Sequence, residues 1–218
     1  MELRIVRHAE STGNAAGRWQ GRDDTQLTDT GREQASRLGK AFRAEGYRPS
    51  RIYASPLSRT FDTARIASSR IGLEDSIVPW DDLMETDVGI FSGLNWEDIE
   101  TRYPEIAVEF AETRNMDIVE GAETLAEKRS RAQRVVDKLI ADHHNGDQVL
   151  VVSHGGIMQF IFAQIVGSNR VWGLSVRNTG VFDFSIDVKK WHLDGHALGN
   201  VNVSRINRFN DVRHLEAG

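Results

Sequence analysis

The sequence contains no cysteine among its 218 residues. This absence excludes disulfide bonds, thiolate metal sites and cysteine nucleophiles. Proline occurs only four times, and no segment has the Pro-, Gly- or Ser-rich composition of a linker. No apolar run is long enough to cross a bilayer, and charged residues follow directly after Met1, unlike a signal peptide. We therefore expect a cytoplasmic protein that does not associate with membranes.

An excess of positive charge is also missing. The formal net charge is −5 and the pI about 5.8, so no global basic field attracts nucleic acid. An anionic ligand would have to be bound by a local arginine cluster. The hydrophobic fraction of 39% and the charged fraction of 27% are ordinary for a globular protein. The length allows a sizeable core, and we predict a single domain over residues 1–218.

Hydrophobic patterning predicts strands that alternate with helices along the chain. The expected strands cover residues 3–6, 51–54, 76–79 and 148–153, with two or three more in residues 181–207. The expected helices cover residues 30–45, 56–70, 96–102, 104–113 and 123–143, with one more after Gly156. This alternation is typical of an α/β fold with three α/β/α layers around a mostly parallel sheet.

Two histidines directly follow predicted strands. His8 follows the first strand and His154 follows the strand at 148–153. Because ligands of open α/β sheets bind beyond the carboxyl ends of strands, we expect both imidazoles to project into one crevice.

Arginines accompany these histidines in positions suited to phosphate. Arg7 precedes His8, and Arg59 lies in the first turn of a predicted helix. A guanidinium is a planar fork that matches phosphate oxygens, and a helix N-terminus also favours anions. A strand-end histidine held through one ring nitrogen leaves the other as a neutral nucleophile. Gly155 and Gly156 would allow a ligand close to the backbone after His154.

Ester hydrolysis also needs an acid to protonate the leaving alkoxide and a base to deprotonate water. The glycine-bearing loop around residues 83–93 carries two carboxylates, Glu85 and Asp87. Either could serve both roles.

Taken together, these motifs resemble the histidine phosphatase superfamily, also called phosphoglycerate mutase-like. The matching segments are 7–10, 19–28, 31–35, 55–59, the loop at Glu85 and 153–155. The resemblance implies that His8 accepts the phosphoryl group and that Glu85 is the general acid and base. It further implies a phosphate pocket of Arg7, Arg59 and His154, with additional contacts from Asn14, Gln20 and Gly21. No metal or other cofactor is implied.

The first alternative is a cofactor-dependent phosphoglycerate mutase using the same His8. Mutases that resemble this chain carry Tyr three residues after the acid, then Lys and an Arg-Arg pair. Here Val88 occupies the first position, and residues 94–119 contain only Arg102 and Arg114 as cations. We therefore favour hydrolysis of the phosphohistidine by water.

Two other classes fit less well. A non-catalytic regulatory module on the same fold would be expected to lose His8, an arginine or Glu85. A zinc hydrolase would need a ligand pattern such as His-Glu-x-x-His, which is absent. His143 and His144 stand at a predicted helix end, and His192 and His196 in a predicted hairpin.

The substrate is expected to be a small phosphorylated metabolite. An insertion at about residues 94–121 is predicted to line the site and partly enclose it. The tail at 206–215 is similar to that of metal-independent phosphoserine phosphatases, so Arg213 or His214 could bind a substrate carboxylate, as in phosphoserine or phosphoglycerate. Those enzymes also have a His in the Glu85 loop, where Val88 stands here. Family members are often dimers, so a homodimer is one expectation.

Overall fold

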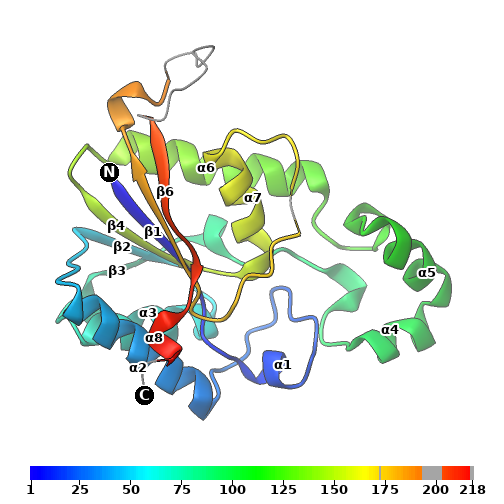
Figure 1. The fold of residues 1–218 in the computed structure, drawn as a ribbon. Coiled ribbons are helices and arrows are strands. Elements are labelled where there is room, and N and C mark those ends of the chain that lie inside the picture. Colours follow the sequence, from blue (N-terminus) through cyan, green and yellow to red (C-terminus); the bar gives the residue numbers. More distant parts are fainter. Residues whose placement is uncertain (172, 193–202, 217–218) are drawn as a thin grey trace.

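The computed structural model describes residues 1–171, 173–192 and 203–216 (Figure 1). Its centre is a sheet with the strand order β3-β2-β4-β1-β5-β6. The strands are β1 (Glu2–Arg7), β2 (Arg51–Ala54), β3 (Ile77–Pro79), β4 (Gln148–Ser153), β5 (Val181–Ile186) and β6 (Ser204–Asp211). The first four strands are parallel, whereas β5 pairs antiparallel with β1 and with β6. The predicted α/β class with a mostly parallel sheet is confirmed.

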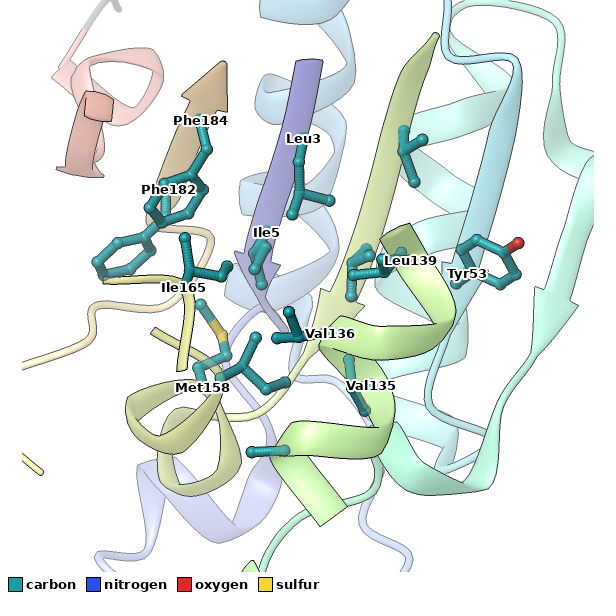
Figure 2. Packing of buried hydrophobic residues seen from close by; sticks show 14 of the residues in the cluster. Leu3, Ile5, Tyr53, Val135, Val136, Leu139, Met158, Ile165, Phe182 and Phe184 are labelled. Carbon is teal, nitrogen blue, oxygen red and sulfur yellow. The ribbon is translucent and has the colours of Figure 1, made fainter. Parts of the chain in front are cut away.

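Helices cover both faces of this sheet. The helices are α1 (Thr12–Ala15), α2 (Asp29–Ala44), α3 (Ser58–Ser69), α4 (Trp96–Arg102), α5 (Pro104–Thr113), α6 (Leu125–Asp142), α7 (Gly155–Ile165) and α8 (Arg213–Glu216). Buried side chains of α6 and α7 pack on one face, and those of α2 and α3 pack on the other. Figure 2 shows the α6–α7 side, where Val136 and Met158 lie close to Ile5.

The alternation of side chains along β4 explains this layering. Val149 and Val151 belong to the cluster with α6 and α7, whereas Leu150 and Val152 belong to the cluster with α2 and α3. Successive strand residues point to opposite faces, so a strand that is covered on both sides is apolar at every position. All four side chains are at most 1% exposed.

Helix boundaries follow local capping. Asn95 caps α4 by accepting a hydrogen bond from the Asp98 N–H, and Pro104 is the first residue of α5, both common helix-start signals. Thr124 caps α6 reciprocally with Glu127, so this helix begins two residues after the expected Glu123. α3 begins at Ser58 and not at Pro56, and its first N–H donates to the Asp24 carboxylate at 2.7 Å.

The insertion at residues 94–121 contains α4 and α5, which lie beside the main sheet (Figure 1). Its apolar side chains pack around Phe91 and Phe110, and the Trp19 ring lies 5.6 Å from that of Phe110 between centroids. Across the described residues, no helix is both long and apolar enough to cross a membrane.

Candidate active site

The two central parallel strands bring their carboxyl ends together. Arg7 of β1 is paired in register with Ser153 of β4, and the next residues are His8 and His154. The two imidazole ring centroids are 5.1 Å apart. The two imidazoles thus lie side by side, as expected, but only His8 lines the cavity, because His154 is fully buried.

Backbone hydrogen bonds fix the chain at His8. Its N–H donates to the Ser153 carbonyl at 2.9 Å, and the Ala9 N–H donates to Oγ1 of Thr63 at 3.0 Å. The ring Nδ1 lies 2.7 Å from the Ala9 carbonyl oxygen. Because a carbonyl only accepts, Nδ1 carries the proton and Nε2 keeps its lone pair. This arrangement presents Nε2 as a fixed nucleophile.

Burial lowers the pKa of His8 well below its ordinary 6.5, and the charges of Arg7 and Arg59 lower it further. The hydrogen bond to the Ala9 carbonyl partly opposes these effects. Desolvation and nearby positive charge both disfavour an imidazolium. His8 is therefore neutral at pH 7, as a nitrogen nucleophile must be.

Two guanidinium groups share the cavity with His8. Arg7 donates from one terminal nitrogen to the Val176 carbonyl at 2.6 Å, and Arg59 donates to the Gly21 carbonyl at 2.8 Å. In both side chains Nε is buried and has no hydrogen-bond partner among the described residues. Unpaired buried N–H groups are rare and costly, whereas phosphate oxygens would satisfy them.

His154 is completely buried behind His8. Its Nε2 lies 2.8 Å from Oγ of Ser55 and 2.9 Å from Oγ1 of Thr60. Burial lowers its pKa well below 6.5, followed by the charges of His8 and Arg59. These hydroxyl contacts fix the orientation of the second imidazole.

Glu85 lies at the N-terminus of α7. Its carboxylate accepts from the backbone N–H groups of Gly156 at 3.2 Å, Ile157 at 3.1 Å and Thr86 at 2.8 Å. These contacts place a carboxylate on the wall of the same cavity as His8. A carboxyl group in this position could exchange a proton with a ligand in the cavity.

A cavity of about 310 Å³ joins these groups. It contains His8, Arg7, Arg59 and Glu85, together with the predicted contact residues Asn14, Gln20 and Gly21. Its remaining walls are formed by Gly17, Arg18, Trp19, Thr86, Val88 and Gly156. The insertion stands behind this wall and packs against Trp19. That it also lines the site stays a prediction.

Asn178 is a residue of this region that the sequence analysis missed. Its Nδ2 donates to the His8 carbonyl at 2.9 Å and to Oδ1 of Asn14 at 3.2 Å. Asn178 therefore connects the segment before β5 to the nucleophile. No motif or hydrophobic period marks its position, so only the tertiary structure could reveal it.

Other predicted residues lie apart from this cavity. Arg213 and His214 line a separate cavity of about 290 Å³, next to Glu45 and Arg208. Arg213 is paired with Asp211, and Nε2 of His214 lies 2.9 Å from Oγ1 of Thr179. Their binding of a substrate carboxylate stays a prediction that this geometry does not favour.

The two candidate carboxylates are also separated. Oδ1 of Asp87 accepts from the Gly89 N–H at 3.0 Å, and Asp87 lines a different cavity from His8. The geometry therefore favours Glu85 over Asp87.

The described residues contain no group of three or more His, Asp or Glu side chains arranged to hold a metal ion. His143 is buried with Nε2 3.2 Å from the Tyr53 hydroxyl, and His192 is exposed. His196 lies outside the described residues.

Comparison with known proteins gives consistent matches. The sequence profile of the histidine phosphatase superfamily (branch 1) matches residues 3–198. Two Arabidopsis thaliana proteins are each 31% identical: phosphoglycerate mutase-like protein 4, over 99% of this chain and 87% of that protein, and metal-independent phosphoserine phosphatase, over 99% and 84%. The solved structure of Bacillus stearothermophilus YhfR has a TM-score of 0.81 at 25% identity, covering 98% of each chain. The similarity extends over nearly the whole chain.

Proposed function

The chain belongs to branch 1 of the histidine phosphatase superfamily, and we propose that it is a phosphatase that hydrolyses a small phosphomonoester through a phosphohistidine on His8. One observation carries this proposal: the His8 imidazole is fixed through Nδ1 to the Ala9 carbonyl, 2.7 Å away, and shares its cavity with the buried Arg59 and the half-buried Arg7. The His8 imidazole is therefore neutral and oriented, and the cations that share its cavity can bind phosphate.

The first half of the reaction forms the phosphohistidine. Nε2 of His8 attacks phosphorus, and the bond from phosphorus to the ester oxygen breaks. Glu85 donates a proton to the departing oxygen, so that an alcohol leaves and not an alkoxide. Arg7 and Arg59 stabilise the negative charge on the three equatorial oxygens, because preorganised cations need no reorganisation as charge develops.

The second half regenerates the enzyme. Water attacks phosphorus, the bond from phosphorus to Nε2 breaks, and Glu85 takes a proton from the water. The products are inorganic phosphate and the original neutral His8 with a protonated Glu85. Arg7 and Arg59 supply the positive charge that a metal ion supplies elsewhere, whereas His154 is neutral and packs beside His8. We therefore propose metal-independent catalysis.

The residues that line the cavity support hydrolysis over mutase activity. Val88 lines the cavity and is apolar, and the insertion cations Arg102 and Arg114 are exposed and lie outside the cavity wall. A mutase must hold a second phosphate group, which needs further cations near the first. Among the described residues of the lining, Arg18 is the one further cation beyond Arg7 and Arg59.

The size and charge of the cavity support a small anionic substrate. A volume of about 310 Å³ is at the lower limit of ordinary ligand pockets. Trp19 and Val88 supply apolar walls, and Arg18 supplies a charge for a group such as a carboxylate. Phosphoserine and phosphoglycerate are therefore proposed as the substrate class.

The test is trapping of the intermediate. After mixing with radiolabelled substrate and rapid acid-free denaturation, wild-type protein is expected to carry one labile phosphoryl group that is lost in acid. His8→Ala should lose both the label and turnover, whereas EDTA should change neither. Near-normal turnover by His8→Ala would rule out the mechanism.

A further inference from the structure

A buried ion pair outside the catalytic cavity borders the loop that carries Glu85. Glu123 precedes α6 and Arg131 lies within it; they are 9% and 5% exposed. Nε of Arg131 donates to Oε1 of Glu123 at 2.7 Å, and a terminal nitrogen donates to Oε2. Neither residue belongs to the cavity around His8.

This pair contacts the Glu85 loop on both sides of Glu85. On the N-terminal side, a terminal nitrogen of Arg131 donates to the carbonyls of Asp82 at 2.9 Å and Met84 at 2.6 Å. On the C-terminal side, the backbone N–H of Glu123 donates to the Asp87 carbonyl at 3.0 Å, and Oε2 lies 3.4 Å from the Asp87 nitrogen.

We propose that Glu123 and Arg131 act as positioning residues that hold Glu85 in place for proton transfer, an inference that rests on the proposed function. One guanidinium fixes two carbonyls before Glu85, and its carboxylate partner fixes the residue two places after it. With the backbone fixed on both sides, only the side-chain torsions of Glu85 remain free. The hydrogen bonds from the N–H groups of Gly156 and Ile157 restrict these torsions.

The energetics of a buried ion pair favour a positioning role for Glu123 and Arg131 over a purely stabilising one. A buried ion pair contributes little net stability because desolvation offsets the attraction. A buried arginine with both carbonyl and carboxylate partners does fix geometry, since its five donors form a rigid fork. Displacement of a catalytic group by about 1 Å can reduce the rate about a hundredfold.

The experiment compares two substrates of nearly equal shape, p-nitrophenyl phosphate and phenyl phosphate. Phenolate is the more basic leaving group, so its departure depends more on an acid. We expect Arg131→Lys to lower kcat/KM at least tenfold for phenyl phosphate and at most about threefold for p-nitrophenyl phosphate, because general acid catalysis contributes about 10²–10⁴-fold. Glu123→Gln should change the ratio in the same direction. Both rates come from one preparation, so partial unfolding cancels from the ratio.

Arg134→Gln is the matched control. Arg134 lies one turn further along α6 and pairs with the Asp82 carboxylate at 2.7 Å, but its side chain is 56% exposed. It contacts the side chain and not the backbone of the loop. The ratio of the two rates should remain that of the wild type.

Glu85→Gln separates this inference from the function on which it rests. Glu85→Gln should show the same selective loss of kcat/KM for phenyl phosphate. Adding Arg131→Lys to Glu85→Gln should not change the ratio of the two kcat/KM values further, because both substitutions remove the same contribution from acid catalysis. Selective loss in Glu85→Gln with equal losses for both substrates in Arg131→Lys and Glu123→Gln would overturn the positioning role alone. Equal losses in Glu85→Gln would instead refute its acid role, and the inference with it.

Discussion

At the scale of single residues, the position of Glu85 depends on the missing side chain of Gly156. A Cβ atom at Gly156 would lie 2.4 Å from Oε1 of Glu85 and 2.8 Å from Oγ1 of Thr86. Real Cβ atoms do not approach so closely, so any larger residue would displace the carboxylate. Glycine thus allows two consecutive N–H groups of α7 to bind Glu85.

We expect Gly156→Ala to lower kcat at least tenfold for phenyl phosphate while leaving the protein folded, because the Glu85 carboxylate must move. Steady-state kinetics and a thermal melt measure both effects. Gly155→Ala is the matched control: its Cβ would lie 3.5 Å from Nε of Arg7, an ordinary contact. Similar losses in both variants would contradict the displacement of Glu85.

How well the sequence predicted a site residue depended on the element that carries it. His8 and His154 could be placed in one site because each directly follows an apolar strand. The residue pattern alone could not distinguish Glu85 from Asp87, since both lie on one irregular loop, and only the family resemblance selected Glu85. Asn178 was missed because no motif or hydrophobic period marks its position before β5. Arg213 and His214 resembled a family tail, but β6 directs them to another cavity.

At the scale of elements, the contact between α2 and the segment after His8 is unusually close. A Cβ atom at Gly31 would lie 2.0 Å from the Glu10 carbonyl oxygen. The Thr28 N–H donates to the same carbonyl at 3.0 Å, and its hydroxyl donates to the Glu10 carboxylate at 2.7 Å. The N-terminus of α2 therefore supports the backbone that leads from His8 to Asn14.

Gly31→Ala is expected to lower the free energy of unfolding by about 1–3 kcal/mol, the usual cost of overpacking, even though alanine is the better helix former. Urea denaturation measures this change. Lys40→Ala, at an exposed position of α2, should stay within about 0.5 kcal/mol of wild type. An unchanged midpoint for Gly31→Ala would mean that α2 can move away from Glu10 without cost.

Sequence reasoning predicted elements best where capping and periodicity agreed. The bounds expected for α4, α5 and β4 are those observed, because Asn95, Pro104 and the apolar run of β4 are strong local signals. β6 extends to Asp211, beyond the expected residue 207. It is an edge strand with many exposed side chains, so pairing with β5 and not hydrophobic alternation determines its length.

At the scale of the whole molecule, burial of two imidazoles links stability to pH. The pKa values of both His8 and His154 are lowered well below 6.5 in the folded protein, whereas unfolding returns them to about 6.5. The unfolded chain therefore binds more protons than the folded chain when the pH is below 6.5. Stability is fully present above this pH and decreases as the pH falls towards the folded-state pKa values.

We expect the melting temperature to fall from pH 7 to pH 5.5, with a slope in unfolding free energy of up to about 1.4 kcal/mol per pH unit for each buried imidazole. Calorimetry over this range measures the slope. His8→Asn should reduce the slope by about half of this contribution. A slope that is the same in wild type and variant would mean that His8 titrates normally in the folded state.

The order of strands was beyond sequence reasoning. Alternating strands and helices predicted three layers, but not that β1 would lie between β4 and β5. Neighbours in a parallel sheet are selected by packing of the helices on both faces. This packing joins distant parts of the chain, as Ile5 and Met158 show by belonging to one buried cluster. Local patterns carry no information about such pairings.

That strand order has a consequence during synthesis. The first strand emerges from the ribosome long before either neighbour, because β4 starts at Gln148 and β5 at Val181. Pairing between segments so distant in sequence is slow to form, and domains tend to fold as units once their partners are available. A nascent chain will hold His8 without its companion imidazole or its Asn178 support. Activity should therefore appear abruptly, late in translation, and partial chains should be inert towards cellular phosphate esters.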